Sequence, residues 1–169
     1  MKKFIPKMYQ KNIYNINYQK LKAKGIKLLI FDLDNTIGSV QEEVMSQRTA
    51  DFLNKLSKDF LIVIASNSKE ERVKKFCSPV SFYYVFFALK PTSKSFKKIK
   101  KKYNIAYQEM AMIGDQIITD ILGANCLHIY TILVDPIDKD LKVTSLNRKL
   151  EEIINKKNKL IRGNYYEEK

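Results

Sequence analysis

Two carboxylates, separated by one residue, stand directly after a short apolar run of the sequence. The run covers residues 28–31, and Asp32 and Asp34 follow it within the segment Asp-Leu-Asp-Asn-Thr. Residues i and i+2 of an extended chain share a face, and like charges held this close need a cation. The pair therefore predicts a metal-assisted acid site. By themselves, Asp34 and Asn35 are also typical of a turn that ends a strand.

Further polar side chains follow the other apolar runs of the chain. In open α/β sheets, ligands bind outside the carboxyl ends of the strands, so these residues are candidates for the same site. The candidates are Ser66, Asn67, Lys90, Gly114, Asp115 and Asp120.

These residue types match the needs of phosphoryl transfer. An attacking carboxylate and a phosphoryl group repel each other unless a cation screens both. Mg²⁺ is a hard, octahedral ion that accepts carboxylate, carbonyl and phosphate oxygens. We expect Asp32, Asp115 and the main-chain carbonyl of Asp34 to bind it. The Ser66 hydroxyl and the Lys90 ammonium would hold the phosphoryl oxygens.

The elements that must position these residues alternate between short apolar runs and longer helix-like stretches, which is typical of βαβ units. We expect a three-layer, doubly wound α/β fold around a parallel five-stranded sheet. The expected strands cover residues 28–31, 61–65, 82–87, 110–113 and 129–134. The expected helices cover residues 46–58, 69–76, 93–103 and 144–161, and a frayed tail is expected over 163–169.

Composition limits the classes of protein that fit. A chain of 169 residues with 45% hydrophobic residues suits a single domain over 1–169. No apolar stretch is long enough to span a membrane and no apolar segment follows the basic start, so we expect a cytoplasmic protein. Cys77 and Cys126 are more typical of buried small residues than of a disulfide.

The same residues, in the same order, resemble the motifs of the haloacid dehalogenase-like (HAD) phosphatase superfamily, which are Asp-x-Asp-x-Thr, Ser, Lys and Gly-Asp-x-x-x-x-Asp. The resemblance implies a HAD-like, Rossmann-like fold in which Asp32 forms an aspartyl-phosphate and Asp34 serves as general acid and base. It implies that Thr36 supports this loop beside the substrate. It also implies that Ser66 and Lys90 hold the phosphoryl group.

The rest of the resemblance concerns the metal and the cap. It implies that Asp115 binds the metal, with Gly114 and Asp120 supporting it. Asn67 is either a substrate contact or a turn cap. Only about two dozen residues separate the first and second motifs, and the second and third, so we expect an open site without a large cap domain.

A longer match points to one subgroup. It includes Gly-Ile-Lys at residues 25–27, Ser-Asn-Ser at 66–68, Lys-Pro at 90–91 and Gly-Asp-Gln at 114–116. This pattern resembles the IIIA-type YqeG-like phosphatases, which are related to the mitochondrial phosphatidylglycerophosphate phosphatases. The resemblance implies a hydrolase of phospholipid biosynthesis that converts phosphatidylglycerophosphate to phosphatidylglycerol.

The net charge of +13 favours anionic partners, although a coding bias toward Lys, Asn, Ile and Tyr could also produce it. Within residues 1–25, apolar residues from Ile5 to Ile16 recur at near-helical spacing among lysines. This basic amphipathic segment would either lie on an anionic membrane at its inner face or cover the core of the domain. Asp135 and Asp138 match no motif and are expected in a solvated loop.

Two alternatives share parts of this pattern. A phosphatase of a soluble sugar phosphate, a nucleotide or a phosphoprotein would use the same chemistry. A basic protein that binds nucleic acid or the ribosome belongs to another class. It is disfavoured because clustered carboxylates repel phosphate backbones, and the sequence has no recognisable nucleic-acid motif.

Overall fold

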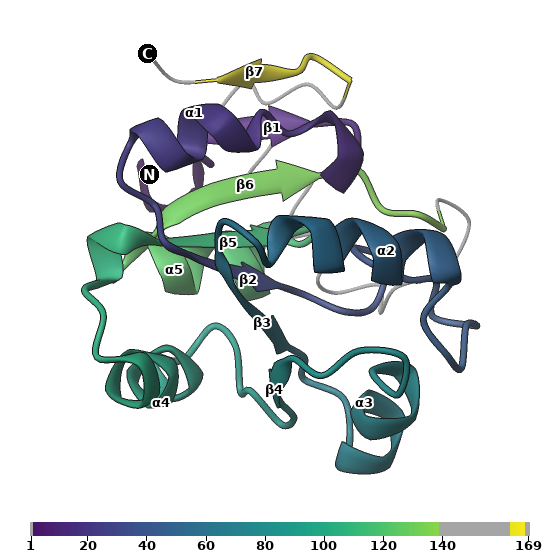
Figure 1. The fold of residues 1–169 in the computed structure, drawn as a ribbon. Helices are drawn as coiled ribbons and strands as arrows, with labels where there is room; N and C mark the ends of the chain where they lie inside the picture. Colours follow the sequence, from purple (N-terminus) through teal and green to yellow (C-terminus); the bar gives the residue numbers. More distant parts are fainter. Residues whose placement is uncertain (1, 139–162, 168–169) are drawn as a thin grey trace.

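Seven strands form one sheet in the computed structural model, which describes residues 2–138 and 163–167. Their order across the sheet is β4-β3-β2-β5-β6-β1-β7. The strands are β1 (Met8–Gln10), β2 (Leu28–Phe31), β3 (Leu61–Ala65), β4 (Tyr83–Val85), β5 (Met110–Gly114), β6 (Tyr130–Val134) and β7 (Tyr166–Glu167). All neighbouring pairs are parallel except β1 and β7. The carboxyl ends of β1 to β6 therefore lie at one edge of the sheet (Figure 1).

Helices cover both faces of this sheet (Figure 1). The α-helices are α1 (Tyr18–Ala23), α2 (Gln47–Leu56), α3 (Glu70–Phe76), α4 (Lys94–Tyr103) and α5 (Gly123–Asn125). The other helical segments are the 3₁₀ helices η1 (Lys2–Phe4), η2 (Ile13–Asn15) and η3 (Tyr107–Glu109), and the π-helix η4 (Ile117–Leu122).

The alternation of side chains along β2 divides the core into two layers. Leu29 and Phe31 pack on the face that is covered by α1, α2 and α3. Leu28 and Ile30 pack on the opposite face, with Phe96 of α4. All four residues of β2 are buried, as a central parallel strand requires. The predicted doubly wound parallel sheet is confirmed, and its five predicted strands correspond to β2 through β6.

The sheet is wider than predicted, because both ends of the described chain add a strand to it. Residues 8–10 form β1 beside β6, so the near-helical spacing of the apolar residues from Ile5 to Ile16 does not produce one helix. Met8, Ile13 and Ile16 are buried in the core, as the core-covering alternative required. The prediction of a frayed tail is wrong for Tyr166–Glu167, which pair with β1.

Other sequence expectations lie partly beyond the described ranges. The helix expected over residues 144–161 falls outside them. Between β2 and α2, residues 32–46 form a loop and no domain is inserted there. The assignment of 1–169 to a single domain stays a prediction. Across residues 2–138 and 163–167, no helix has both the length and the apolar character needed to cross a membrane.

The local sequence explains α2, whose amino end lies near the predicted site. The Ser46 side chain accepts a hydrogen bond from the Thr49 N–H and caps the helix. Apolar side chains then recur at Ala50, Leu53 and Leu56, which face the core.

We expect Leu53→Ala to lower the free energy of unfolding by about 2–5 kcal/mol, because Leu53 is fully buried and the lost methyl groups leave a cavity. The neighbouring Asn54→Ala, at an exposed position of the same helix, is the matched control and should change it by less than about 0.5 kcal/mol. Urea denaturation measures both changes. Equal losses in the two variants would contradict this assignment of the buried face.

Candidate active site

The loop after β2 places Asp32 at the centre of the sheet edge. Its N–H donates to the Ile113 carbonyl of β5 at 2.9 Å, so the strand pairing continues to the carboxylate itself. The chain then turns sharply, because Asn35 has a φ of +66° and the amides of Ile37 and Gly38 both donate to the Leu33 carbonyl. At this turn Asp32 is buried and Asp34 is partly exposed.

Three buried carboxylates meet beneath this turn. One oxygen each from Asp32, Asp115 and Asp120 lies within 4.8 Å of the others. The Thr36 hydroxyl is 3.3 Å from Asp115 Oδ1 and 3.5 Å from Asp32 Oδ2, and it can donate to either. The structure therefore brings together two predicted metal ligands, Asp32 and Asp115, and adds the carboxylate of Asp120.

The buried ammonium of Lys90 stands among these acids. Lys90 Nζ lies 2.5 Å from Asp32 Oδ1 and 2.7 Å from Asp120 Oδ1. Three carboxylates around one ammonium leave excess negative charge in a buried space, which a divalent cation would offset. The residues present therefore fit a metal ion.

Burial sets the protonation of this cluster. Burial raises the pKa of Asp32 to about 7, assisted by the nearby Asp120 and Asp34 and opposed by Lys90. Burial alone would lower the pKa of Lys90, but the Asp120 and Asp32 carboxylates raise it above its usual value. Lys90 is therefore charged at neutral pH, while Asp32 holds a proton readily unless another cation is present.

Asp120 was predicted to support Asp115, and it also contacts the Lys90 ammonium directly. It is fully buried, contacts Lys90, and accepts the Gln116 N–H at 3.1 Å. Its close approach requires a glycine on β5, since a Cβ at Gly114 would lie 2.3 Å from Asp120 Oδ2. Gly114 thus makes room for the carboxylate that holds Lys90.

Two residues outside the cluster of buried acids bind the Asp34 side chain. Its Oδ1 lies 2.8 Å from an Arg72 guanidinium nitrogen, and its Oδ2 accepts the Ser68 hydroxyl at 2.7 Å. The carboxylate of Asp34 is therefore close enough to act on the charge of Asp32, but Arg72 and Ser68 bind it. The expected metal contact through its main-chain carbonyl stays a prediction.

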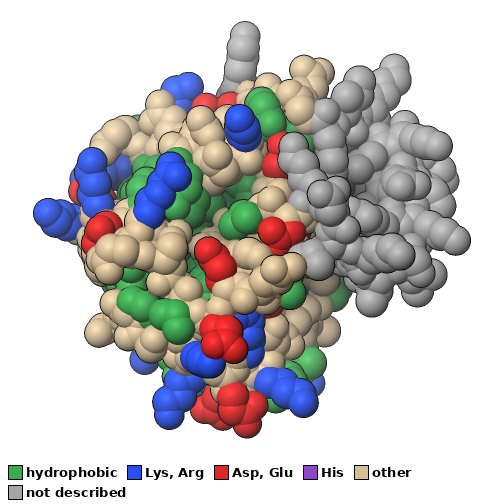
Figure 2. Space-filling view, turned by 90° about the vertical axis from the view of Figure 1, so that its right-hand side faces the viewer, with side chains coloured by type: hydrophobic (Ala, Val, Ile, Leu, Met, Phe, Trp, Pro, Cys, Tyr) green, Lys and Arg blue, Asp and Glu red, His purple; other side chains and the backbone are tan. Residues whose placement is uncertain are grey.

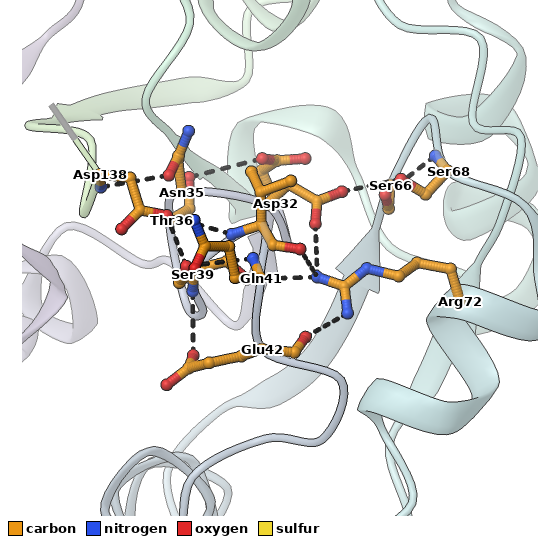
Figure 3. A network of polar contacts seen from close by, with 12 residues as sticks. Asp32, Asn35, Thr36, Ser39, Gln41, Glu42, Ser66, Ser68, Arg72 and Asp138 are labelled. Atoms are coloured by element: carbon orange, nitrogen blue, oxygen red, sulfur yellow. Dashed lines mark hydrogen bonds and ion pairs between the residues drawn. The ribbon is translucent and has the colours of Figure 1, made fainter. Parts of the chain in front are cut away.

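Arg72 is the residue that sequence reasoning missed. It reaches from α3 to Asp34 and also donates to the carbonyls of Ser39 and Val40, both at 3.2 Å, and to that of Glu42 (Figure 3). One signal was available in the sequence. Arg72 is an arginine among lysines at 69, 74 and 75, and only the guanidinium offers a planar fork of donors.

The Asn67 side chain binds the main chain of Lys90, the lysine of the predicted motifs. Its amide oxygen accepts the Lys90 N–H at 2.9 Å, and its amide nitrogen donates to the Lys90 carbonyl at 3.1 Å. The Lys90–Pro91 peptide bond is cis. Ser66 is buried beside this loop, and its hydroxyl oxygen accepts the Ser68 N–H at 3.0 Å. These bonds join Asn67 to a segment 23 positions away rather than capping its own turn, and a contact of Asn67 with substrate stays a prediction.

Asp135 and Asp138 lie in a partly exposed loop as predicted, but both carboxylates are hydrogen-bonded within the protein. Asp138 accepts the hydroxyl of Ser39 and the N–H of Val40, and its own N–H donates to the Asn35 side chain. Asp135 accepts the hydroxyls of Tyr9 and Tyr165. The loop after β6 is thus bonded to the loop after β2.

Comparisons with known proteins agree with this geometry. A HAD-hydrolase-like family model matches residues 88–136, and a mitochondrial PGP phosphatase model matches residues 1–75. The probable phosphatase YqeG of Bacillus subtilis is 34% identical over 153 residues, which cover 89% of each chain. A chloroplastic and mitochondrial phosphatidylglycerophosphate phosphatase 1 of Arabidopsis thaliana is 22% identical over 80% of this chain, which spans 42% of that relative's length.

Solved structures share the fold at lower identity. The cobalt-bound deoxy-D-mannose-octulosonate 8-phosphate phosphatase of Haemophilus influenzae has a TM-score of 0.55 and 14% identity, over 82% of this chain and 91% of that one. The HAD family enzyme BT-2542 of Bacteroides thetaiotaomicron, solved with magnesium and inorganic phosphate, has a TM-score of 0.56 and 15% identity, over 71% of this chain and 100% of that one.

The sheet, the order of the motif residues along its edge and the relationship to YqeG lead to one assignment. This chain belongs to the YqeG-like family of HAD-type phosphatases, which are phosphoric monoester hydrolases.

Proposed function

We propose that this phosphatase is Mg²⁺-dependent, acts through an aspartyl-phosphate on Asp32, and takes a lipid phosphate as substrate. The observation that carries the chemistry is the buried cluster of Asp32, Asp115 and Asp120 around Lys90, with Asp34 beside it. Bound Mg²⁺ would be held by Asp32 and Asp115, with Asp120 adjoining, and would screen the charge of the phosphoryl group.

The first half of the reaction forms a bond between an Asp32 carboxylate oxygen and phosphorus, while the bond from phosphorus to the ester oxygen breaks. Asp34 gives its proton to the departing ester oxygen. The Lys90 ammonium and the Ser66 hydroxyl donate to the phosphoryl oxygens as charge develops on them. Thr36 bridges Asp32 and Asp115 and keeps the nucleophile in place.

In the second half, Asp34 takes a proton from a water molecule, whose oxygen attacks phosphorus and releases Asp32 as a carboxylate. Arg72 and Ser68 each hold one oxygen of Asp34, which fixes the direction in which it exchanges the proton. Because Arg72 acts through Asp34, we assign it a positioning role.

The proposed substrate is phosphatidylglycerophosphate. Support comes from the PGP phosphatase model over residues 1–75 and from the Arabidopsis relative. The absence of an inserted domain between β2 and α2 leaves that side of the site uncovered within the described chain, which suits a bulky substrate. With this function the protein would act at the inner face of a membrane through a peripheral contact. A soluble sugar phosphate, nucleotide or phosphoprotein is the competing substrate class.

We expect Asp32→Asn to abolish phosphate release, because an amide cannot form the aspartyl-phosphate. Asp34→Asn should lower turnover by about 10²–10⁴-fold, the usual contribution of a positioned acid and base. Phosphate release from vesicles that contain phosphatidylglycerophosphate, beside a panel of soluble phosphomonoesters, measures both effects. Full activity of Asp32→Asn with any of them would contradict the mechanism, and a preference for a soluble ester would overturn the lipid assignment.

The raised pKa of Asp32 predicts how metal binding depends on pH. Below its folded pKa of about 7 this carboxyl carries a proton that Mg²⁺ must displace, so metal affinity should rise with pH through this value. Mg²⁺ binding should raise Tm, and we expect a lower Mg²⁺ concentration to saturate this increase at about pH 8 than at about pH 6. Asp115→Asn should weaken the increase at both values. Identical titrations of the wild-type protein at the two pH values would argue against Asp32 as a metal ligand.

The Arg72 assignment is tested by a pair of substitutions. Arg72→Met removes the partner of Asp34 and should lower kcat by about tenfold or more, since a misplaced acid fails in the transition state. Arg72→Lys keeps the charge but loses the fork, and we expect it to recover part of kcat. A change in KM alone, with kcat unaltered, would instead indicate a residue that only binds substrate.

A further inference from the structure

Exposed apolar side chains gather at the edge of the sheet that carries the site. Of eight large hydrophobic residues that are exposed in the described chain, six follow the carboxyl ends of strands or lie beside them. We call these six the apolar rim: Val40, Val44, Phe87, Leu89, Ile137 and Tyr165. Figure 2 views this edge, where apolar side chains lie among acidic and basic ones. The other two, Ile5 and Leu61, lie at the opposite edge, before β1 and at the start of β3.

On one side of the site, a fixed backbone holds the rim outward. Phe87 and Leu89 are 52% and 50% exposed. Both residues have positive φ angles, +42° and +54°. Bulky residues rarely adopt this conformation, and it persists only where the surroundings impose it. Here the Phe87 N–H donates to the Ser68 carbonyl at 3.1 Å, and the Ala88 N–H donates to the Ser66 carbonyl at 2.9 Å. The loop that positions Lys90 thus presents two apolar side chains to solvent.

On the other side, the rim is tied to the loop after β2. Val40 and Val44 are each 45% exposed, and Arg72 and Asp138 both bind the main chain of Val40. Ile137 is 50% exposed, and its N–H donates to the Asn35 carbonyl at 3.0 Å. Polar contacts therefore hold apolar side chains in place on both sides of the buried acids.

A phosphoryl site surrounded by apolar side chains fits a phosphomonoester that is part of an amphiphile. We propose that the apolar rim enters the surface of a lipid layer, so that a phosphorylated headgroup reaches Asp32 without leaving that layer. This inference rests on the proposed lipid substrate and adds the surface through which the protein would meet it.

The position of the basic N-terminal segment supports the rim as the contact surface. Lys2, Lys3 and Lys7 line a hollow with Cys126 and His128, at the amino ends of β1 and β6. A membrane held by these lysines would lie against the edge opposite the site. Exposed charges of both signs stand near the rim, among them Glu42, Lys69 and Glu70. The proposal assigns the contact to the apolar side chains, so it should persist at high salt, unlike attraction to anionic lipid.

The test compares the two edges of the sheet. Phe87→Ser/Leu89→Ser alters the rim, and Ile5→Ser/Leu61→Ser is the matched control, with two exposed apolar residues at the opposite edge. Val40→Ser/Val44→Ser alters the rim on its other side and serves if the first variant folds poorly. The probes are phosphatidylcholine vesicles that carry phosphatidylglycerophosphate, and glycerol phosphate in solution. Sedimentation with vesicles and phosphate release from each probe are measured.

We expect both rim variants to lose sedimentation, and the ratio of vesicle to glycerol phosphate turnover to fall about tenfold or more, because apolar burial at the interface is lost. The control and a Lys2→Glu/Lys3→Glu/Lys7→Glu variant should sediment like the wild-type protein, in low and high salt. Sedimentation that survives both rim variants, or that depends on the three lysines, overturns the proposal. A wild-type protein that sediments but releases no lipid phosphate retains the rim and refutes the substrate, so the two failures are distinguishable.

Discussion

The packing of three carboxylates around one ammonium beneath the central strands is the constraint on which the site depends. Asp32, Asp115 and Asp120 are buried with an oxygen of each within 4.8 Å of the others, and Lys90 offsets only part of their negative charge. Three other residues support this arrangement. Gly114 leaves room for Asp120, Asn67 binds the Lys90 main chain, and the Thr36 hydroxyl contacts Asp115. The fold thus maintains a charge imbalance that favours a metal ion.

The parallel sheet makes such a cluster possible. β2 lies between β3 and β5, so residues distant in the sequence reach one edge from neighbouring strands. Asp32 continues the pairing of β2 with β5 by one hydrogen bond, which fixes the nucleophile relative to Asp115. Short strands that are buried on both faces give this edge a rigid base, while the loops beyond it carry the chemistry.

Much of this could be predicted from the sequence, and the rest depended on distant contacts. Apolar runs located β2 to β6, and polar residues after them located Asp32, Ser66, Lys90 and Asp115. The strands β1 and β7 are three and two residues long, too short to show a period of two. Arg72 and Asp34 lie 38 positions apart, and Ser39 and Asp138 lie 99 apart. Patterns within a short stretch of sequence cannot predict contacts between residues this far apart.

From α3, Arg72 binds both the acid Asp34 and the Ser39 and Val40 carbonyls farther along the same loop. A ligand that displaces this loop must also disturb the acid, because the same guanidinium holds both. Recognition and proton transfer would then be linked. Discrimination among phosphate esters would be expressed in the rate of the chemical step, and a poorly fitting ester could bind well and still be cleaved slowly.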